Sequence, residues 1–343
     1  MTRIGMVLTI VVLALVFARD PAAAQTAMGF ASYGGAYQDA QRKVMLEPAG
    51  KAFNVTFTEG QLFGVGPVRE QVKSGQVKWD IAVLSLPDAA IASKEGLVEP
   101  LDYAVIDARG LAKEMAHRDF VCQNYTSNII GWNSTKLAGP APQTWAEFFD
   151  TAKFPGMRAL RNRAITSLEI VLLADGVAPD KLYPLDVDRG FRFLEKHRAS
   201  IGTFWTSGAQ PAELVKTGKA DLVHIWSGRA VAAQREGVPV QFHYNQGLLG
   251  ADCLVVPKGA PQKALAMKVV ATFLDPGRQA ELAKLLDYGP TNPRALEVGM
   301  TKEEAARMNS SPENIRTQVL IDPWWWAENG ARVEARWAEF LKK

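Results

Sequence analysis

The residue with the clearest capacity for chemistry is Asp252, which precedes four apolar residues at positions 253–256. Pro257 and Gly259 end this run, so the pattern predicts a short buried strand with an acid at its mouth. Burying a carboxylate is costly unless a cation or hydrogen-bond donors meet it. Asp252 is therefore a candidate for binding a positively charged group.

Residue patterns for catalysis, phosphate binding and metal binding are missing from the sequence. It holds no GxSxG, HExxH or GxxxxGK[ST] motif, and no paired acids with a plausible nucleophilic partner. The two cysteines form no CxxC motif, and the histidines are scattered at His117, His197, His224 and His243. We therefore expect no enzyme activity, no cofactor and no metal site.

Residues 1–24 have the pattern of a secretory signal peptide. Arg3 supplies a positive charge, Met6–Phe17 is apolar, and Ala22–Ala24 fits a cleavage site. The apolar stretch is shorter than the roughly 20 residues that a membrane span needs, and no cysteine follows it for lipid attachment. We expect a soluble periplasmic protein that begins at Gln25.

Export changes the interpretation of the only two cysteines, Cys122 and Cys253. Each lies in a strand-like run, and an oxidising compartment allows such a pair to form a disulfide. The alternative is two separate small side chains buried as apolar groups. We favour the disulfide.

Length and composition suit two globular lobes of ordinary kind. The chain has 343 residues, of which 48% are apolar and 22% are charged. The net charge is only +3, and no run of Lys and Arg is dense. Both features argue against a nucleic-acid partner.

Strand-like and helix-like segments alternate, which predicts an α/β fold with mostly parallel sheets flanked by helices. The apolar runs at 79–85 and 220–226 repeat one pattern, and the runs at 120–133 and 250–257 are placed to cross between two lobes as hinge strands. The predicted parts are a first lobe from 25–126 and 253–300, a second lobe from 127–252, and C-terminal helices at 301–343 on the second lobe. The aromatic run Pro323–Trp326 is expected to attach the last helix to that lobe.

Four segments together resemble the periplasmic solute-binding proteins of bacterial ABC transporters, with the spermidine/putrescine-binding family as the nearest branch. They are Trp79–Ser85, Gly218–Gly228, Asp252–Pro261 and Tyr288–Pro293. The resemblance implies a type II two-lobe fold that captures a small solute in the cleft between the lobes. It also implies delivery of that solute to permease subunits in the inner membrane, without catalysis. We expect a monomer.

The resemblance further implies the ligand and the residues that bind it. The family holds polyamines with aromatic rings and carboxylates, through cation–π attraction and charge-assisted hydrogen bonds. The matching positions are Tyr33, Tyr37, Ser85, Glu169, Trp226, Asp252 and Tyr288. Each has an ordinary alternative, such as core packing for Trp226 or a surface turn for Tyr33. On this basis we expect a putrescine- or spermidine-like amine as the ligand.

Departures from the family pattern leave other ligands open. Thr166 stands where the family has an acid, one helical turn before Glu169, and Gly250 replaces an aromatic residue. Arg161 and Arg163 lie just upstream, either in a solvated loop or in the site. In the site, Arg163 is a candidate contact for a carboxylate, and the ligand would then be a zwitterionic ω-amino acid such as γ-aminobutyrate.

Two further classes are weaker alternatives. A ferric-iron receptor of the same fold would use clustered tyrosines, histidines and acids, but the adjacent tyrosine pair is missing from this chain. An exported enzyme is disfavoured by the missing catalytic motifs.

Overall fold

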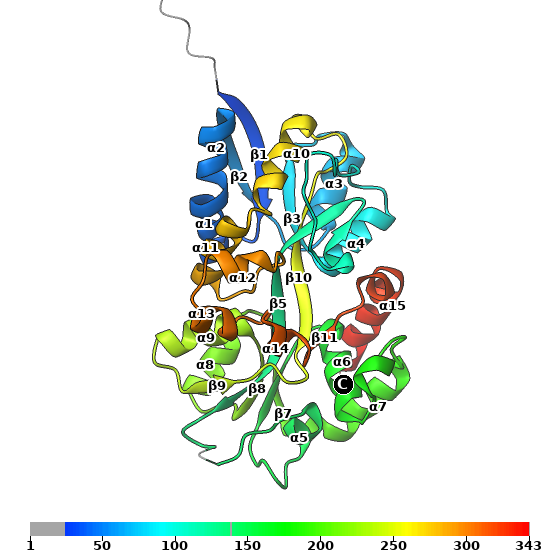
Figure 1. Ribbon diagram of the computed structural model, residues 1–343. Helices are drawn as coiled ribbons and strands as arrows, with labels where there is room; N and C mark the ends of the chain where they lie inside the picture. The colour runs from blue at the N-terminus through cyan, green and yellow to red at the C-terminus, as the bar shows by residue number, and fades with distance from the viewer. Residues whose placement is uncertain (1–24, 138, 343) are drawn as a thin grey trace, which may run out of the picture.

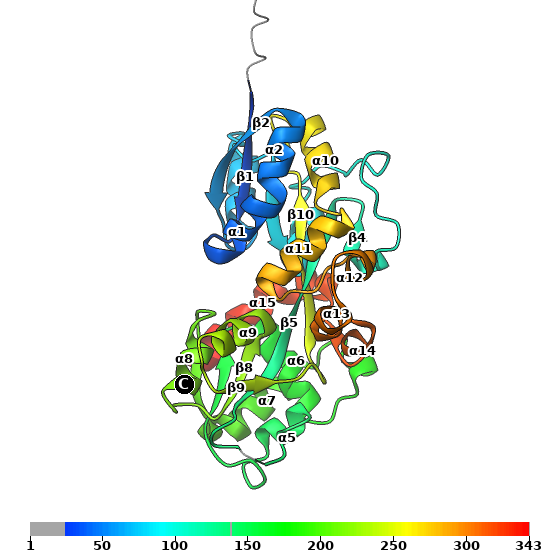
Figure 2. The same ribbon diagram turned by 60° about the vertical axis from the view of Figure 1, so that its left-hand side comes forward.

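The computed structural model describes residues 25–137 and 139–342, and the predicted signal peptide lies outside them. Two α/β lobes are stacked in Figure 1 and meet at a narrow waist. Strands β5 (Phe120–Asn133) and β10 (Leu248–Val255) run through this waist, which Figure 2 shows from a second side. The predicted two-lobe α/β fold with crossing strands is confirmed.

The first lobe is built on parallel strands with helices on both faces. Strand β1 pairs in parallel with β2 and with β3, and β10 pairs with β3 in the antiparallel sense. The elements are β1 (Thr26–Ser32), α1 (Gly35–Gln41), a π-helical segment (Arg42–Leu46), α2 (Glu47–Phe53), β2 (Val55–Gln61), α3 (Gly66–Ser74), β3 (Ile81–Ser85), α4 (Leu86–Lys94), a 3-10 helix (Lys113–Met115), β4 (Ala116–His117), α10 (Lys263–Thr272), α11 (Pro276–Leu286) and α12 (Arg294–Val298).

The second lobe repeats this arrangement on the other half of β5. Strand β6 pairs in parallel with β7 and β8, while β8 and β9 pair antiparallel to β5. The elements are α5 (Trp145–Phe149), β6 (Arg158–Arg161), α6 (Ala164–Ala174), a 3-10 helix (Pro179–Lys181), α7 (Val187–His197), a second 3-10 helix (Arg198–Ser200), β7 (Ile201–Trp205), α8 (Gln210–Lys216), β8 (Leu222–Trp226), α9 (Ser227–Arg235) and β9 (Val240–Phe242).

The crossing strands join both lobes into one sheet, with the order β2-β1-β3-β10-β5-β8-β6-β7. The first half of β5 pairs with β10, and its second half pairs with β8 and β9. The sequence predicted two sheets joined by strands, and the backbone pairing makes them continuous. The exact lobe boundaries at residues 126 and 253 stay a prediction, and each falls within a crossing strand.

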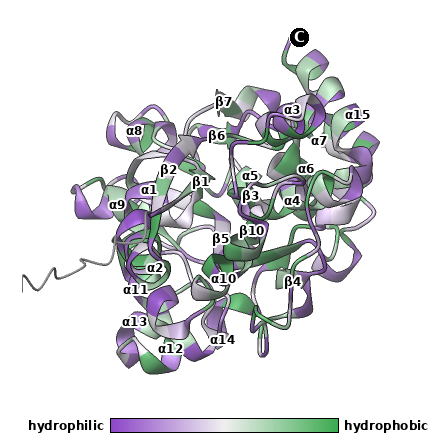
Figure 3. Cartoon of the chain, turned by 90° about the horizontal axis from the view of Figure 1, so that it is seen from above, coloured by the Kyte–Doolittle hydropathy of each residue, from purple (hydrophilic) through white to green (hydrophobic). Residues whose placement is uncertain are grey.

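Each lobe has its own apolar core beneath its helices. Phe30 stacks on Phe273 in the first lobe, with 5.9 Å between ring centroids. Trp145 packs edge-on against Phe148 in the second lobe, at 5.2 Å. Figure 3 shows hydrophobic residues along the central strands and hydrophilic ones on many outer helices. Within residues 25–137 and 139–342, no helix combines the length and apolar character of a membrane span.

The C-terminal tail comprises α13 (Lys302–Arg307), α14 (Pro312–Ile315), β11 (Val319–Leu320) and α15 (Pro323–Leu341). Helix α15 packs into the second-lobe core through Trp326 and Trp337, as expected. Trp324 differs from the prediction, because its ring lies 4.9 Å from that of His117 in the first lobe. Glu328 also pairs with Lys94 of α4 at 3.0 Å. The start of α15 therefore contacts both lobes.

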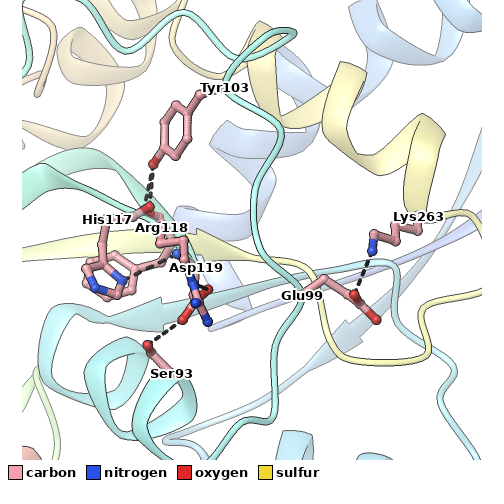
Figure 4. A network of polar contacts seen from close by, with 8 residues as sticks. Ser93, Glu99, Tyr103, His117, Arg118, Asp119 and Lys263 are labelled. Atoms are coloured by element: carbon pink, nitrogen blue, oxygen red, sulfur yellow. Dashed lines mark hydrogen bonds and ion pairs between the residues drawn. The ribbon is translucent and has the colours of Figure 1, made fainter.

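A polar network holds the first-lobe surface that Trp324 contacts (Figure 4). The buried Asp119 carboxylate accepts hydrogen bonds from Ser93 Oγ at 2.7 Å and Arg118 Nε at 2.8 Å. Tyr103 donates to the backbone oxygen of His117. Because these bonds fix β4 and its turn, His117 presents its ring to α15 in a defined position.

A disulfide joins the two crossing strands at the waist. Cys122 of β5 lies opposite Cys253 of β10 in the strand register, and the two sulfur atoms are bonded. The prediction of a disulfide is confirmed. The bond links residues 131 positions apart, so in the unfolded chain it closes a long loop.

Reduction of this disulfide should lower the free energy of unfolding, because the chain without the crosslink gains more entropy on unfolding than the crosslinked chain does. For a loop of this length the chain-entropy model gives roughly 4–5 kcal/mol as an upper value. The measurement is thermal unfolding with and without reductant. The Cys122→Ala/Cys253→Ala double variant is the control and should not respond to reductant. Two free thiols in the denatured, unreduced protein would contradict the bond.

Candidate functional site

Asp252 lies at the waist in β10, between the neighbouring strands β3 and β5. It is opposite Ser85 of β3 on one side and Asn124 of β5 on the other, and only 7% of it is exposed. Asn124 Nδ2 donates to its carboxylate at 2.9 Å. The Tyr37 hydroxyl in turn donates to Asn124 Oδ1 at 2.8 Å. The backbone pairing of three strands thus fixes the position of one buried acid.

No cation compensates this acid within the described part of the chain. No Lys, Arg or His side chain of the described residues forms an ion pair with Asp252. Burial raises the pKa of Asp252 to about 6, although Asn124, Tyr37 and Tyr33 each lower it by hydrogen bonding. A ligand ammonium would supply the missing charge and lower this pKa again.

Three tyrosines surround the acid. The Tyr33 ring lies 5.4 Å from that of Tyr37, which lies 6.3 Å from that of Tyr288. Burial, reinforced by the Asp252 charge, raises the pKa of all three phenols. The buried Tyr33 hydroxyl has no hydrogen-bond partner of good geometry among the described residues. These rings and this hydroxyl suit an alkyl ammonium group, whose methylenes pack on ring faces.

The second lobe contributes an arginine at the end of β6. The Arg161 guanidinium lies over the Trp226 ring, 5.0 Å from its centroid, and Trp226 packs edge-on against Trp205. Burial, assisted by the Arg163 charge, lowers the pKa of Arg161 to about 10, while Glu334 and Asp88 act in the opposite sense. Among the described acids, none forms an ion pair with Arg161. This stacked cation is suited to bind a carboxylate.

The charge of Asp88 in the first lobe acts on the pKa of Arg161 in the second lobe. Asp88 lies in the first turn of α4, where it accepts a hydrogen bond from Ser85 Oγ at 2.5 Å. Its charge raises the pKa of both Tyr33 in the first lobe and Arg161 in the second. Arg229, in the first turn of α9, acts similarly on Tyr288, because it lowers the pKa of that phenol. Groups from both lobes thus surround one region.

Two of the predicted site residues are instead engaged within the protein. The Glu169 carboxylate is fully buried and accepts hydrogen bonds from Thr166 N at 2.9 Å, Tyr183 Oη at 2.6 Å and Trp326 Nε1 at 2.6 Å. Burial raises the pKa of Glu169 to about 7 despite these donors. Arg163 pairs with Glu334 of α15 at 2.9 Å. Both residues hold the start of α6 to α15, and no contact among the described residues joins them to the Asp252 cluster.

The other predicted residues are brought together, and the structure adds further ones. Tyr33, Tyr37 and Tyr288 gather around Asp252, Ser85 adjoins it, and Trp226 carries the arginine. Residues that sequence reasoning missed are Asp88, Asn124 and Arg229, together with Gln123, whose Nε2 donates to the Tyr37 hydroxyl at 3.0 Å. Asn124 follows the cysteine of β5 by two positions, so the expected disulfide was the one signal that could have placed it beside Asp252.

Comparison with known proteins assigns the family. Residues 65–309 match the bacterial extracellular solute-binding proteins, and the chain belongs to this family. A γ-aminobutyric acid-binding protein of Pseudomonas aeruginosa is 31% identical over 329 residues, covering 94% of this chain and 93% of that protein. A spermidine/putrescine-binding periplasmic protein of Salmonella typhimurium is 22% identical over 275 residues, covering 77% of each.

Solved structures agree with this assignment. An ABC transporter substrate-binding protein from Bradyrhizobium japonicum is 39% identical, with a TM-score of 0.88 over 92% of this chain and all of the other. A GABA receptor is 33% identical, with a TM-score of 0.85 over 92% of this chain and 97% of the other. This protein is therefore the substrate-binding component of an ABC transporter, and the prediction that it is not an enzyme is confirmed.

The raised pKa of Asp252 predicts how stability depends on pH in the ligand-free protein. The folded state holds the proton more tightly than the unfolded chain, whose Asp has a pKa near 3.8. The stability that protonated Asp252 contributes is present below about pH 4 and is lost as pH rises through about 6. Between pH 5 and 8, Asp252→Asn should flatten the fall in the thermal midpoint by roughly 2–5 °C.

This measurement needs protein that has been unfolded and refolded to remove bound solute. Asp107→Asn is the control, because Asp107 is on the surface and its pKa is lowered rather than raised. Parallel pH curves for the parent protein and Asp252→Asn would show that the acid is not buried in the folded state.

Glu169→Gln tests whether Glu169 is structural. The new amide would place an N–H group against Thr166 N or against the two side-chain donors, so one buried donor would lose its acceptor. We expect a loss of about 1–3 kcal/mol in the free energy of unfolding at pH 8. Denaturant titration measures this, with the exposed Glu236→Gln as control. A gain in stability would instead mark Glu169 as an acid awaiting a ligand.

Proposed function

We propose that this substrate-binding protein takes up a zwitterionic ω-amino acid of the γ-aminobutyrate type and delivers it to membrane permease subunits. The observation that carries the proposal is a pair of opposite charges, one from each lobe, that form no ion pair with any residue the structure describes. Asp252 is a buried acid beside the first lobe, and Arg161 is a stacked cation in the second. A ligand with an ammonium at one end and a carboxylate at the other complements both.

A diamine complements only one of these charges. Its first ammonium would meet Asp252 and the tyrosines, but its second would approach the Arg161 guanidinium, and like charges in a desolvated site repel. Arg229 adds a second positive charge near Tyr288. The polyamine specificity expected from the family resemblance therefore has less physical support than the amino-acid alternative.

Sequence identity to relatives with named ligands also favours an ω-amino acid over a polyamine. A GABA receptor of known structure is 33% identical, whereas the spermidine/putrescine-binding relative is 22% identical. In the sequence prediction Arg163 was the carboxylate contact, and we now propose Arg161 for this role, because Arg163 is held by Glu334. The proposed ammonium site consists of Asp252, Tyr33 and Tyr37.

The two arginines provide a matched pair of variants. Calorimetric titration of ligand-free protein with γ-aminobutyrate should show at least about 30-fold weaker binding for Arg161→Gln, since removing one partner of a buried charge pair costs 2 kcal/mol or more. Arg163→Gln should change the affinity by less than about threefold, because its guanidinium is paired with Glu334. Asp252→Asn should abolish binding of γ-aminobutyrate and putrescine alike.

Selectivity gives the decisive readout. The ratio of putrescine to γ-aminobutyrate affinity should rise in Arg161→Gln, because the repulsion of a second ammonium is removed. Parent protein that prefers putrescine, or an Arg161→Gln variant with unchanged γ-aminobutyrate affinity, would overturn the proposal. The first of these outcomes would restore the polyamine assignment.

A further inference from the structure

Phe63 has an unusual environment for a large apolar side chain. It is 74% exposed, the highest value among the large apolar side chains in the described part of the chain. Its neighbours in the loop after β2 are anchored, since Leu62 is 2% exposed and Val65 is 8% exposed. Leu62 N also donates to the Ser32 backbone oxygen at 2.9 Å. The ring is therefore presented to solvent from a backbone held on both sides.

The loop that carries Phe63 borders the candidate site. The Phe63 ring stacks on that of Tyr33, with 6.3 Å between centroids and 21° between planes. Gln61 lies against the turn after Tyr33, because a Cβ atom on Gly34 would come within 2.5 Å of Gln61 Nε2. On the other side, a Cβ atom on Gly64 would lie 3.7 Å from Asp88 Oδ1. The loop thus runs from the ammonium site towards the acid that faces Arg161.

Single exposed apolar residues are common and usually need no explanation. Phe63 differs because its ring continues the aromatic series of Tyr33, Tyr37 and Tyr288 outwards. The inner members surround the charged group, and the outer member has a free face. A flat apolar surface at this place is suited to the methylene groups between the two ends of a ligand.

We propose that Phe63 is a specificity-determining residue, whose ring covers the aliphatic chain of the bound ω-amino acid and limits its length. This inference rests on the proposed function. Asp252 and Arg161 hold the charged ends of the ligand. The length of its aliphatic chain is therefore limited by the side chain that packs beside its methylene groups. A longer chain must bow outwards and push the Phe63 ring away from Tyr33, which loses their stacking contact.

The test uses a series of ω-amino acids that differ only in length: β-alanine, γ-aminobutyrate, 5-aminopentanoate and 6-aminohexanoate. Calorimetric titration gives the dissociation constant of each for the parent protein, Phe63→Ala, Phe63→Leu and Phe63→Trp. Val298→Ala is the control, because Val298 is an exposed apolar residue at the end of α12, with 58% exposure. Thermal unfolding of the ligand-free variants should agree within a few degrees, since each change is at a solvent-exposed side chain.

We expect Phe63→Ala to weaken γ-aminobutyrate binding about tenfold and to reduce the discrimination against 6-aminohexanoate at least fivefold. Phe63→Leu should fall between the parent and Phe63→Ala, and Phe63→Trp should increase the discrimination. Val298→Ala should match the parent throughout. If the parent binds the series and Phe63→Ala leaves the ratios unchanged within twofold, this inference alone is overturned. If the parent binds no member of the series, the proposed function is overturned and this inference with it.

Discussion

The structure depends on a buried carboxylate, Asp252, to which residues 25–137 and 139–342 offer no ion pair. Asp252 is held by an asparagine amide and lies close to two phenols, yet burial still raises its pKa to about 6. A protein optimised only for stability would replace such a group by an apolar residue, because a buried charge is costly. Its position in the middle of a three-strand pairing fixes its place, so under the proposed function the cost would be offset by a ligand ammonium. Binding and stability are thus opposed at this residue.

The disulfide at the waist offsets the loss of stability that the buried Asp252 causes. Asp252 lies in β10, one residue before the disulfide that joins β10 to β5. Both strands run through the waist and take part in the sheet that joins both lobes. The bond stabilises the folded chain at the place where the buried acid destabilises it. Helix α15 adds a second connection, through Trp324 to His117 in the first lobe and through Trp326 to Glu169 in the second. The lobes are therefore linked at the strands and along one side.

Sequence patterns predicted the parts of this arrangement that depend on local order. Apolar runs, and the Gly and Pro residues that end them, predicted the two lobes and the crossing strands. The same patterns placed the two cysteines in strands and Asp252 at the start of one. The hydrogen bond from Trp326 to Glu169 could not be predicted, because Trp326 is 157 positions away and reaches Glu169 only through packing of α15. Likewise, Arg161 and Arg163 look equivalent in the sequence, and Glu334 of α15 decides which of them is paired. Long-range contacts of one C-terminal helix thus separated structural residues from candidate ligand contacts.

The distribution of charge between the lobes explains how one fold can serve different amines. The proposed ammonium site lies with β10 and the first-lobe tyrosines, whereas Arg161 lies at the end of β6 in the second lobe. A ligand with two opposite charges interacts with both lobes, so its binding energy favours the arrangement in which they are close. A diamine would gain at one lobe and lose at the other. On the proposed function, changing the sign of the second-lobe group while keeping the first-lobe site would exchange diamines for amino acids. Under the proposed function, Arg161, stacked on Trp226 in the second lobe, is the group of that sign in this chain.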